Sequence, residues 1–207
     1  MSTFTIPPTH TTLPLLIPDV NVSARMIEDR RARGIDHHDE VWEGVYVMSP
    51  LANNEHQRLT TLFAAIFVEV IDRSELGQSF VGVNLTDQQD NWLRNYRCPD
   101  VVVFLKGNPA QNRDTHWIGG PDLVIEIVSP YDRTRERIGF YEAIGARELL
   151  VVDRDPWQLE LFRLSNGKLV SIGITTLDDG MALASETAHL SFRLTPAEDR
   201  PEVEITH

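Results

Sequence analysis

Glu126 is the residue whose setting says most about possible chemistry in this chain. It lies inside the run 123–128, in which all the residues except Glu126 are apolar. A short apolar run of this kind is typical of a strand buried on both faces. A carboxylate without a compensating partner there would cost several kcal/mol or become protonated. We therefore expect either a metal ion or an arginine in a structural salt bridge beside Glu126, and this residue alone does not separate the two.

Asp100 is the second acidic residue of interest, because it follows Cys98-Pro99 and begins another apolar run, 101–105. An aspartate after proline is common in turns, so a turn role is the alternative. If the two runs are neighbouring strands, the carboxylates of Asp100 and Glu126 can converge on one divalent ion. Asp122 competes as a partner, but it lies roughly 13 Å from Glu126 along the same strand at about 3.3 Å per residue. We therefore favour Asp100.

Two arginines follow Glu126 in a predicted helix, residues 132–144. At about 100° per residue, four residues define its apolar face: Ile138, Phe140, Tyr141 and Ile144. Arg137 falls in the middle of that face, and Arg133 lies on it one turn earlier. An arginine on a core-facing stripe needs a buried anionic partner, and Glu126 is the expected one.

The other elements follow from periodicity and turn residues. We expect a helix at 24–33 capped by Ser23, and a long helix at 54–71. The remaining predicted strands are 41–48, 79–85, 148–152 and a hairpin, 158–164 with 168–172, turning at Asn166-Gly167. The order predicts one α/β domain over residues 23–194, with an irregular arm at 1–22 and a loose acidic tail at 195–207.

Composition limits the class of protein. The chain has 19 Lys and Arg against 31 Asp and Glu, a formal net charge of -12, which argues against indiscriminate DNA binding. Bound cations and local arginines can still reverse the field at one site. The single cysteine, Cys98, excludes an internal disulfide framework and a Cys-rich zinc site. No apolar run could span a bilayer and no secretory signal is evident, so we expect a cytoplasmic protein.

Several short motifs occur together: Arg97-Cys98-Pro99-Asp100, Glu126-Ile127-Val128-Ser129-Pro130, Arg137 with Tyr141 and Gly145, Trp42-Glu43-Gly44, and Met48-Ser49-Pro50 with His56. In this combination the chain resembles a large bacterial family of restriction-endonuclease-like proteins in the PD-(D/E)XK nuclease superfamily. The resemblance covers about residues 25–165. It implies a restriction-endonuclease-like core, that is, a mixed β-sheet flanked by helices, here with an N-terminal arm and a C-terminal β-hairpin extension.

The resemblance also implies hydrolysis of phosphodiester bonds at a Mg²⁺ (or Mn²⁺) site. Asp100 matches the aspartate after proline, and Glu126 matches the acid of the second motif; both would bind the metal. The superfamily's lysine two residues after that acid is replaced here by Val128. In the resembling family this lysine lies on the following helix, where this chain has Arg137. Arginine keeps the positive charge but cannot act as a base, so we expect slow catalysis or none.

Three further residues are candidates for the site. Arg133 shares a helix face with Arg137, and His56 begins the helix 54–71, where a capping or surface role is the alternative. Glu43 could be another ligand, although a solvated strand acid is the simpler interpretation. We interpret His37-His38 as loop, and Cys98 as a small buried residue rather than a nucleophile.

Three interpretations of the sequence remain open. The chain could be a metal-dependent DNA endonuclease, or a weak or inactive nuclease-fold module that binds nucleic acid or a protein. The third interpretation is a purely structural α/β domain, which would leave two core-facing charges without a function. We also expect a homodimer, because cutting both strands calls for two sites. The hairpin is the expected interface, because its apolar residues exceed what a small appended sheet could cover: Leu159, Leu161, Phe162 and Leu164.

Overall fold

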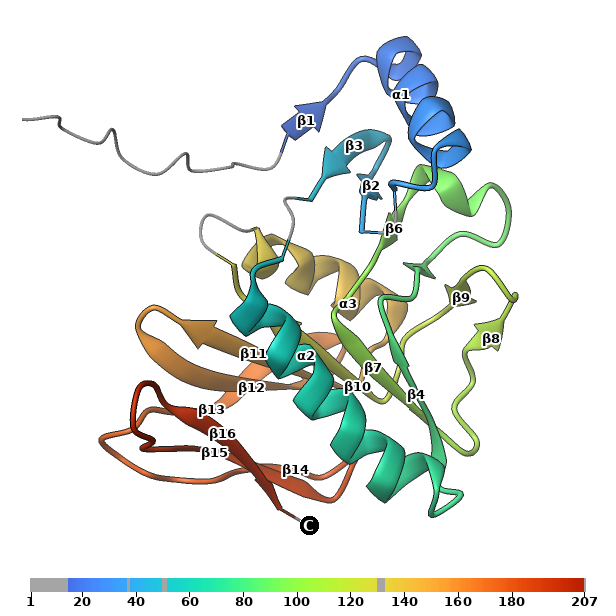
Figure 1. The fold of residues 1–207 in the computed structure, drawn as a ribbon. Coiled ribbons are helices and arrows are strands. Elements are labelled where there is room, and N and C mark those ends of the chain that lie inside the picture. The colour runs from blue at the N-terminus through green and yellow to red at the C-terminus, as the bar shows by residue number, and fades with distance from the viewer. Residues whose placement is uncertain (1–14, 37, 50–51, 130–132, 207) are drawn as a thin grey trace, which may run out of the picture.

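The structure, a computed structural model, describes residues 15–36, 38–49, 52–129 and 133–206 (Figure 1). Its central element is a six-stranded mixed sheet. The strands, in spatial order, are β13 (Lys168–Thr175), β12 (Trp157–Ser165), β11 (Glu148–Arg154), β10 (Leu123–Ile127), β7 (Val101–Leu105) and β4 (Gly77–Val81). The two apolar runs that carry Asp100 and Glu126 are therefore neighbours, as predicted.

The pairing around β10 matches the predicted crossover. β10 is antiparallel to β7 and parallel to β11. The chain returns from β10 to β11 through a 3₁₀ turn, η3 (Thr134–Arg137), and the helix α3 (Ile138–Ile144). Gly145 ends α3 in the left-handed conformation, with φ of 80°. The predicted helix 132–144 is thus a 3₁₀ turn followed by a short α-helix, and Asp132 lies outside the described residues.

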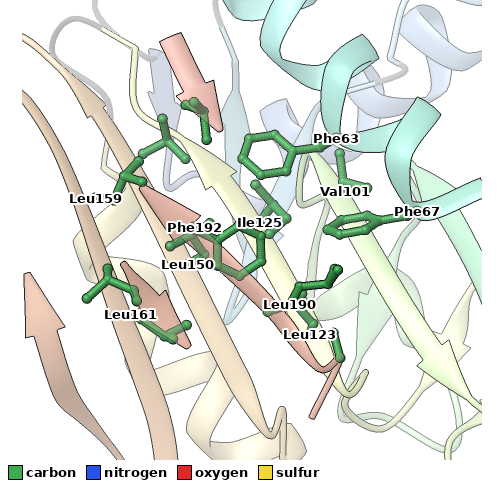
Figure 2. Packing of buried hydrophobic residues seen from close by; sticks show 14 of the residues in the cluster. Phe63, Phe67, Val101, Leu123, Ile125, Leu150, Leu159, Leu161, Leu190 and Phe192 are labelled. Carbon is green, nitrogen blue, oxygen red and sulfur yellow. The ribbon is translucent and has the colours of Figure 1, made fainter. Parts of the chain in front are cut away.

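One face of the central sheet is covered by α2 (Asn54–Phe67), which a π-helical turn, η1 (Val68–Asp72), continues. A separate three-stranded sheet covers the same face: β14 (Leu183–Ser185), β15 (Leu190–Thr195) and β16 (Glu202–Thr206). Phe63 and Phe67 from α2 meet Phe192 of β15 above Ile125 (Figure 2). Burial of each phenylalanine stabilises the fold by about 1.5–3 kcal/mol.

The opposite face of the central sheet packs against α3. Phe140 and Tyr141 of α3 lie with Val124 and Leu149 in a second cluster of buried apolar residues. Because both faces are covered, β10 and β7 are buried almost throughout. This burial explains why the two strands could be predicted from apolar runs alone.

The N-terminal half also forms a seven-stranded sheet of short strands. In spatial order these are β1 (Leu15–Ile17), β3 (Val45–Met48), β2 (Glu40–Trp42), β6 (Tyr96–Arg97), β5 (Leu85–Thr86), β9 (Trp117–Ile118) and β8 (Gln111–Asn112). A helix, α1 (Val20–Ala32), and a 3₁₀ turn, η2 (Trp92–Arg94), lie along it.

Several local predictions for this half were wrong. The side chain of Asp19, not Ser23, caps α1 by accepting from the amides of Asn21 and Val22. The predicted strand 41–48 is a hairpin of β2 and β3. The predicted strand 79–85 is split at Gly82, whose φ is +61°, between two sheets.

The ends of the chain are also more ordered than expected. Residues 15–22 of the predicted irregular arm form β1 and begin α1, and residues 1–14 lie outside the described residues. The predicted loose tail contains β16, which pairs antiparallel with β15 from Ser191–Thr206 to Thr195–Glu202. The hairpin β12–β13 is confirmed, with Asn166 and Gly167 both at positive φ, but it belongs to the central sheet rather than to an appended one. In the described ranges, no helix is long and apolar enough to cross a membrane.

Candidate functional site

Asp100 lies at the start of β7, and its side chain reaches across to the neighbouring strand. Its Oδ2 accepts a hydrogen bond from the backbone amide of Ile127 at 2.7 Å. Val101 pairs with Ile125 in the antiparallel register of β7 and β10. The carboxylate of Asp100 is therefore held beside the Glu126–Ile127 peptide, on the strand that carries Glu126.

Glu126 is withdrawn from water, with 1% of the residue exposed. Its Oε2 accepts from Nη1 of Arg137 at 2.7 Å, and its Oε1 accepts from the hydroxyl of Tyr141. The predicted pairing of Glu126 with Arg137 is therefore confirmed. The pKa of Glu126 is raised to about 8, chiefly by burial and in part by the nearby carboxylates of Asp100 and Glu40, against the opposing charge of Arg137.

Glu40 is a third buried acid at this site, and the sequence analysis missed it. It is completely buried at the start of β2. Its Oε1 accepts from the amide of Cys98 at 2.9 Å, and its Oε2 accepts from the indole of Trp42 at 2.6 Å. The same Oε2 lies 3.3 Å from Nε of Arg137. Arg137 therefore spans two buried carboxylates.

Glu43, the acid that the sequence proposed in this region, lies elsewhere. It occupies the exposed turn between β2 and β3, with φ of 50°. The available signal for Glu40 was its place directly before the apolar residues Val41 and Trp42. A second signal was Arg137, which lies on an apolar helix face and can pair with more than one acid. Treating 41–48 as one strand obscured that signal, because the hairpin turn decides which acid faces the core.

His56 is brought to Asp100 by the N-terminus of α2. Asn53 caps that helix by accepting from the amide of His56 at 2.9 Å. The imidazole Nε2 lies 3.2 Å from Oδ1 of Asp100, and His56 is 8% exposed. The expectation that His56 could reach the site is therefore met in geometry.

Arg133 lies at the same opening, stacked on an aromatic side chain. Its guanidinium carbon is 4.8 Å from the centre of the Trp42 ring, and that of Arg97 is 4.6 Å from the same ring. Arg133 also forms an ion pair with Glu136. Cation–π stacking of this kind holds a guanidinium in place while it keeps its charge. Arg97 is buried and donates to the carbonyl of Val41, so its role is structural.

These groups surround a cavity of about 90 Å³. Asp100, His56, Arg133 and Arg137 line it, and Glu126 lies behind Arg137. Cys98 also lines the cavity, but burial raises the pKa of its thiol, which disfavours a thiolate nucleophile. The cavity combines one accessible carboxylate, two histidines (His38 and His56) and two guanidinium groups, a set that suits a phosphate ester.

Arg154, at the end of β11, supports the segment that borders the cavity. It donates to the carbonyl of Val128 at 2.9 Å and to Oδ1 of Asn53 at 2.8 Å, and it forms an ion pair with Glu55. The N-terminus of α2 and the end of β10 are thus tied together. His56 belongs to the first of these regions, and Asp100 is hydrogen-bonded to Ile127 in the second, so Arg154 helps to fix their relative position.

Asp122, the acid that competed with Asp100, has a structural role. Its Oδ2 accepts from the amide of Leu105 and from the side chain of Asn108, each at 2.7 Å. Its Oδ1 forms an ion pair with Arg147. Asp122 therefore joins neighbouring segments at the far end of the sheet, away from the cavity.

The fit of a divalent cation can be judged from the donor set. The described parts of the chain contain no group of three or more His, Cys, Asp or Glu residues arranged to hold a metal ion. Mg²⁺ commonly uses only one or two carboxylates and keeps several waters. Glu40 and Glu126 both pair with Arg137, and the pKa of Glu126 is raised first by burial and then by the nearby carboxylates of Asp100 and Glu40. Asp100 offers such an ion an accessible carboxylate at the cavity wall, and Glu126 could join it only by exchanging its contacts with Arg137 and Tyr141 for the cation.

Comparison with known proteins supports the resemblance noted in the sequence. Residues 27–197 match the model of the Uma2 family, which is described as "Putative restriction endonuclease". A protein of Synechocystis sp. (strain PCC 6803), "Uncharacterized protein slr1290", is 27% identical over 114 residues. That match covers 54% of this chain and 56% of the relative, so the chain matches only about half the length of the relative.

A solved structure has the same fold. The crystal structure of a "putative nuclease belonging to DUF820" from Anabaena variabilis superposes with a TM-score of 0.59 at 16% identity. The match covers 73% of this chain and 83% of the other. It confirms the restriction-endonuclease-like α/β architecture predicted from the sequence.

Proposed function

The chain belongs to the Uma2 family, and on this premise we propose that it is a Mg²⁺-dependent (or Mn²⁺-dependent) endonuclease that hydrolyses phosphodiester bonds in DNA. The observation that carries the proposal is the hydrogen bond from the Ile127 amide to Asp100. That contact brings the Asp100 carboxylate to the strand of Glu126, at the wall of a cavity that Arg133 and Arg137 also line.

Asp100 and Glu126 would hold the cation. When bound, a divalent cation at this position would supply charge stabilisation to a phosphodiester and make a coordinated water more acidic. Asp100 is the more accessible of the pair, with 19% of its side chain exposed, whereas Glu126 has 1% exposed. We therefore expect Asp100 to determine whether a cation binds, and Glu126 to complete the site.

The arginines would serve the substrate in different ways. Arg137 is fixed by Glu126 and Glu40, so it acts as a positioned charge that stabilises negative charge on the phosphate. Arg133 is 29% exposed and lies over Trp42 at the opening, where it can contact a backbone phosphate. Neither guanidinium can accept a proton. Two histidines in the cavity, His38 and His56, could exchange one, and His56 is the one that lies beside Asp100.

The net charge of -12 bears on how DNA would be bound. Repulsion between an acidic protein and DNA weakens binding that depends on charge alone. We therefore expect weak binding without metal and a marked gain when Mg²⁺ is present. This dependence on metal separates a specific site from a generally basic surface.

A plasmid-cleavage assay tests the proposal. The wild-type protein should nick or linearise supercoiled DNA with Mg²⁺ or Mn²⁺ and should not do so in EDTA. Asp100→Asn should remove the activity, and Glu43→Gln, which changes an exposed acid in a turn, should leave it intact. Cleavage that survives Asp100→Asn would overturn this assignment of the site.

A second candidate function is a catalytically weak or inactive nuclease fold that binds nucleic acid or a protein. The observation that favours it is the environment of Arg137, which occupies the lysine position of the resembling family and engages Glu126 directly. In that case fluorescence anisotropy should detect metal-dependent DNA binding while the plasmid stays intact. If neither binding nor cleavage occurs with any divalent ion, nucleic acid is not the ligand.

A further inference from the structure

The outer edge of the central sheet is formed by β13, and this strand is unusual for an exposed edge. Three of its apolar side chains are about half exposed, namely Val170 at 51%, Ile172 at 44% and Ile174 at 47%. Within the described part of the chain, β12 is the only strand that pairs with β13. A row of backbone amides and carbonyls therefore faces outward beside an apolar strip.

Edge strands normally carry features that prevent pairing with other chains, such as proline, charged residues or short length. The segment 169–175 has no proline and no charged residue. β13 is eight residues long. By contrast β16, an edge strand of the three-stranded sheet, carries Glu202 and Glu204. Apart from a β-bulge at Ile172, where the register with β12 shifts, the edge of β13 lacks the charged residues that protect the edge at β16.

The residues that were expected to make this hairpin a dimer interface are not the exposed ones. Leu159 and Leu161 are fully buried under the three-stranded sheet, and Phe162 packs on the α3 face. The uncovered apolar surface lies instead on the other strand of the hairpin, at Ile172 and Ile174. Ile174 pairs with Glu160, whose carboxylate binds Arg135 of η3, so these isoleucines face the α3 side of the sheet.

We propose that β13 pairs antiparallel with β13 of a second copy of this chain, so that the two central sheets join into one continuous sheet. Two identical strands related by a two-fold axis perpendicular to the sheet are self-complementary, and the assembly closes at two copies. Ile172 and Ile174 of both copies would then lie on one face of the joined sheet, where cross-strand apolar pairs stabilise it.

The distribution of charge favours a second copy in this orientation. Lys168 begins β13 and is exposed, with its Nζ 2.9 Å from Oε2 of Glu142 in the same chain, and Asp178 follows just beyond the end of β13 and is also exposed. An antiparallel arrangement brings the Lys168 end of one copy to the Asp178 end of the other. A parallel arrangement would place like charges together at both ends. Opposite charges flanking an apolar centre therefore select antiparallel self-pairing.

This inference extends the proposed function, because a two-fold dimer would carry two cavities. It can nevertheless be tested without any nuclease assay. β13 is separated from β10 by β11 and β12, so the interface leaves the cavity uncovered. Failure of dimerisation would leave the assignment of Asp100 and Glu126 standing, and an inactive protein could still be a dimer.

Light scattering after size-exclusion chromatography, at about 10–100 μM chain, tests the proposal. The wild type should have twice the 23.5 kDa chain mass, and Ile172→Lys should be monomeric. Val81→Lys is the matched control, because Val81 is 50% exposed on β4 at the opposite edge of the same sheet. It should remain dimeric. A monomeric wild type, or a dimer lost in Val81→Lys and kept in Ile172→Lys, overturns the proposal.

A charge exchange gives a second measurement that does not depend on an apolar substitution. Lys168→Asp and Asp178→Lys should each weaken the dimer, seen as a larger dissociation constant in sedimentation equilibrium. The double variant should recover most of the affinity, because the opposite charges meet again. Recovery would support the antiparallel arrangement, and a double variant weaker than both single variants would contradict it.

Discussion

Arg137 and Glu126 form a buried ion pair in which Nη1 of the arginine donates to Oε2 of the glutamate at 2.7 Å. Only 12% of the arginine side chain and 1% of the glutamate side chain are exposed. Removing one partner of such a pair leaves an unpaired charge in a dry environment, which commonly costs about 3–5 kcal/mol. The pair therefore contributes to folding whether or not the protein cleaves DNA.

At about pH 9, above the pKa of Glu126, Arg137→Ala should accordingly lower the free energy of unfolding by about 3 kcal/mol in EDTA. Adding Glu126→Gln should restore part of that loss, because the orphaned carboxylate is removed as well. Urea denaturation of the four proteins in this double-mutant cycle gives the coupling energy, expected on the order of 2 kcal/mol. Additive effects would show that the ion pair is energetically unimportant.

The pH dependence of stability should report the state of Glu126. Burial raises its pKa to about 8 in the folded chain, above an ordinary value of 4.5. The folded state therefore holds the proton more tightly, so the stabilising contribution is complete below pH 4.5 and is lost as pH rises through about 8. In EDTA, the wild type should lose stability relative to Glu126→Gln between pH 5 and pH 9.

The control for this prediction is Glu43→Gln, which changes an exposed acid. Its stability difference from the wild type should stay flat over the same pH range. A flat difference for Glu126→Gln as well would mean that Arg137 and the Tyr141 hydroxyl keep Glu126 ionised throughout. The charge of Arg137 and the hydrogen bond from Tyr141 would then lower the pKa of Glu126 by more than burial raises it.

The sequence was informative wherever one residue contradicted its surroundings. A glutamate inside an apolar strand and an arginine on an apolar helix face each required a partner, and they proved to be partners of each other. Asp100 was placed on the condition that the runs 101–105 and 123–128 are neighbouring strands, and the pairing of β7 with β10 meets that condition. These inferences rest on the cost of burying charge, which a single sequence displays directly.

The features that could not be predicted depend on local turns and long-range packing. Glu40 has no sequence signal stronger than that of Glu43, and a left-handed turn at Glu43 and Gly44 decides which acid enters the core. The pairing of β16 with β15 also escaped prediction, because Glu202 and Glu204 resemble a solvated tail. Such choices are made by tertiary contacts rather than by local propensity.

Metal binding should depend on Asp100. Isothermal titration with Mg²⁺ and with Mn²⁺ should show binding to the wild type, and Asp100→Asn should weaken it at least about tenfold, or about 1.4 kcal/mol. The reason is that Asp100 supplies the accessible carboxylate of the cavity. Glu43→Gln should bind as the wild type does. Equal affinities for the wild type and Asp100→Asn would remove Asp100 from the metal site.

Arg137→Lys tests whether the arginine limits catalysis. A lysine has one nitrogen and cannot reproduce the contacts of Nη1 with Glu126 and Nε with Glu40, so the variant should be less stable by about 1–2 kcal/mol. Lysine can, however, lose its proton when buried, and arginine effectively cannot. If the chemistry needs a proton transfer at this position, the wild type cleaves slowly and the variant should cleave faster in single turnover with Mg²⁺.

The expected pattern is thus a gain in rate together with a loss of stability, which no purely structural role of Arg137 would produce. Rates should be measured well below the melting temperature of the variant, with circular dichroism as the check on folding. Arg137→Ala serves as the reference without a charge and should not cleave. A wild type that cleaves rapidly and slows on Arg137→Lys would show that the chemistry needs only the fixed charge of the guanidinium and no proton transfer at this position. In that case the Asp100–Glu126 metal pair could stand, and only the proposed limitation by Arg137 would be wrong.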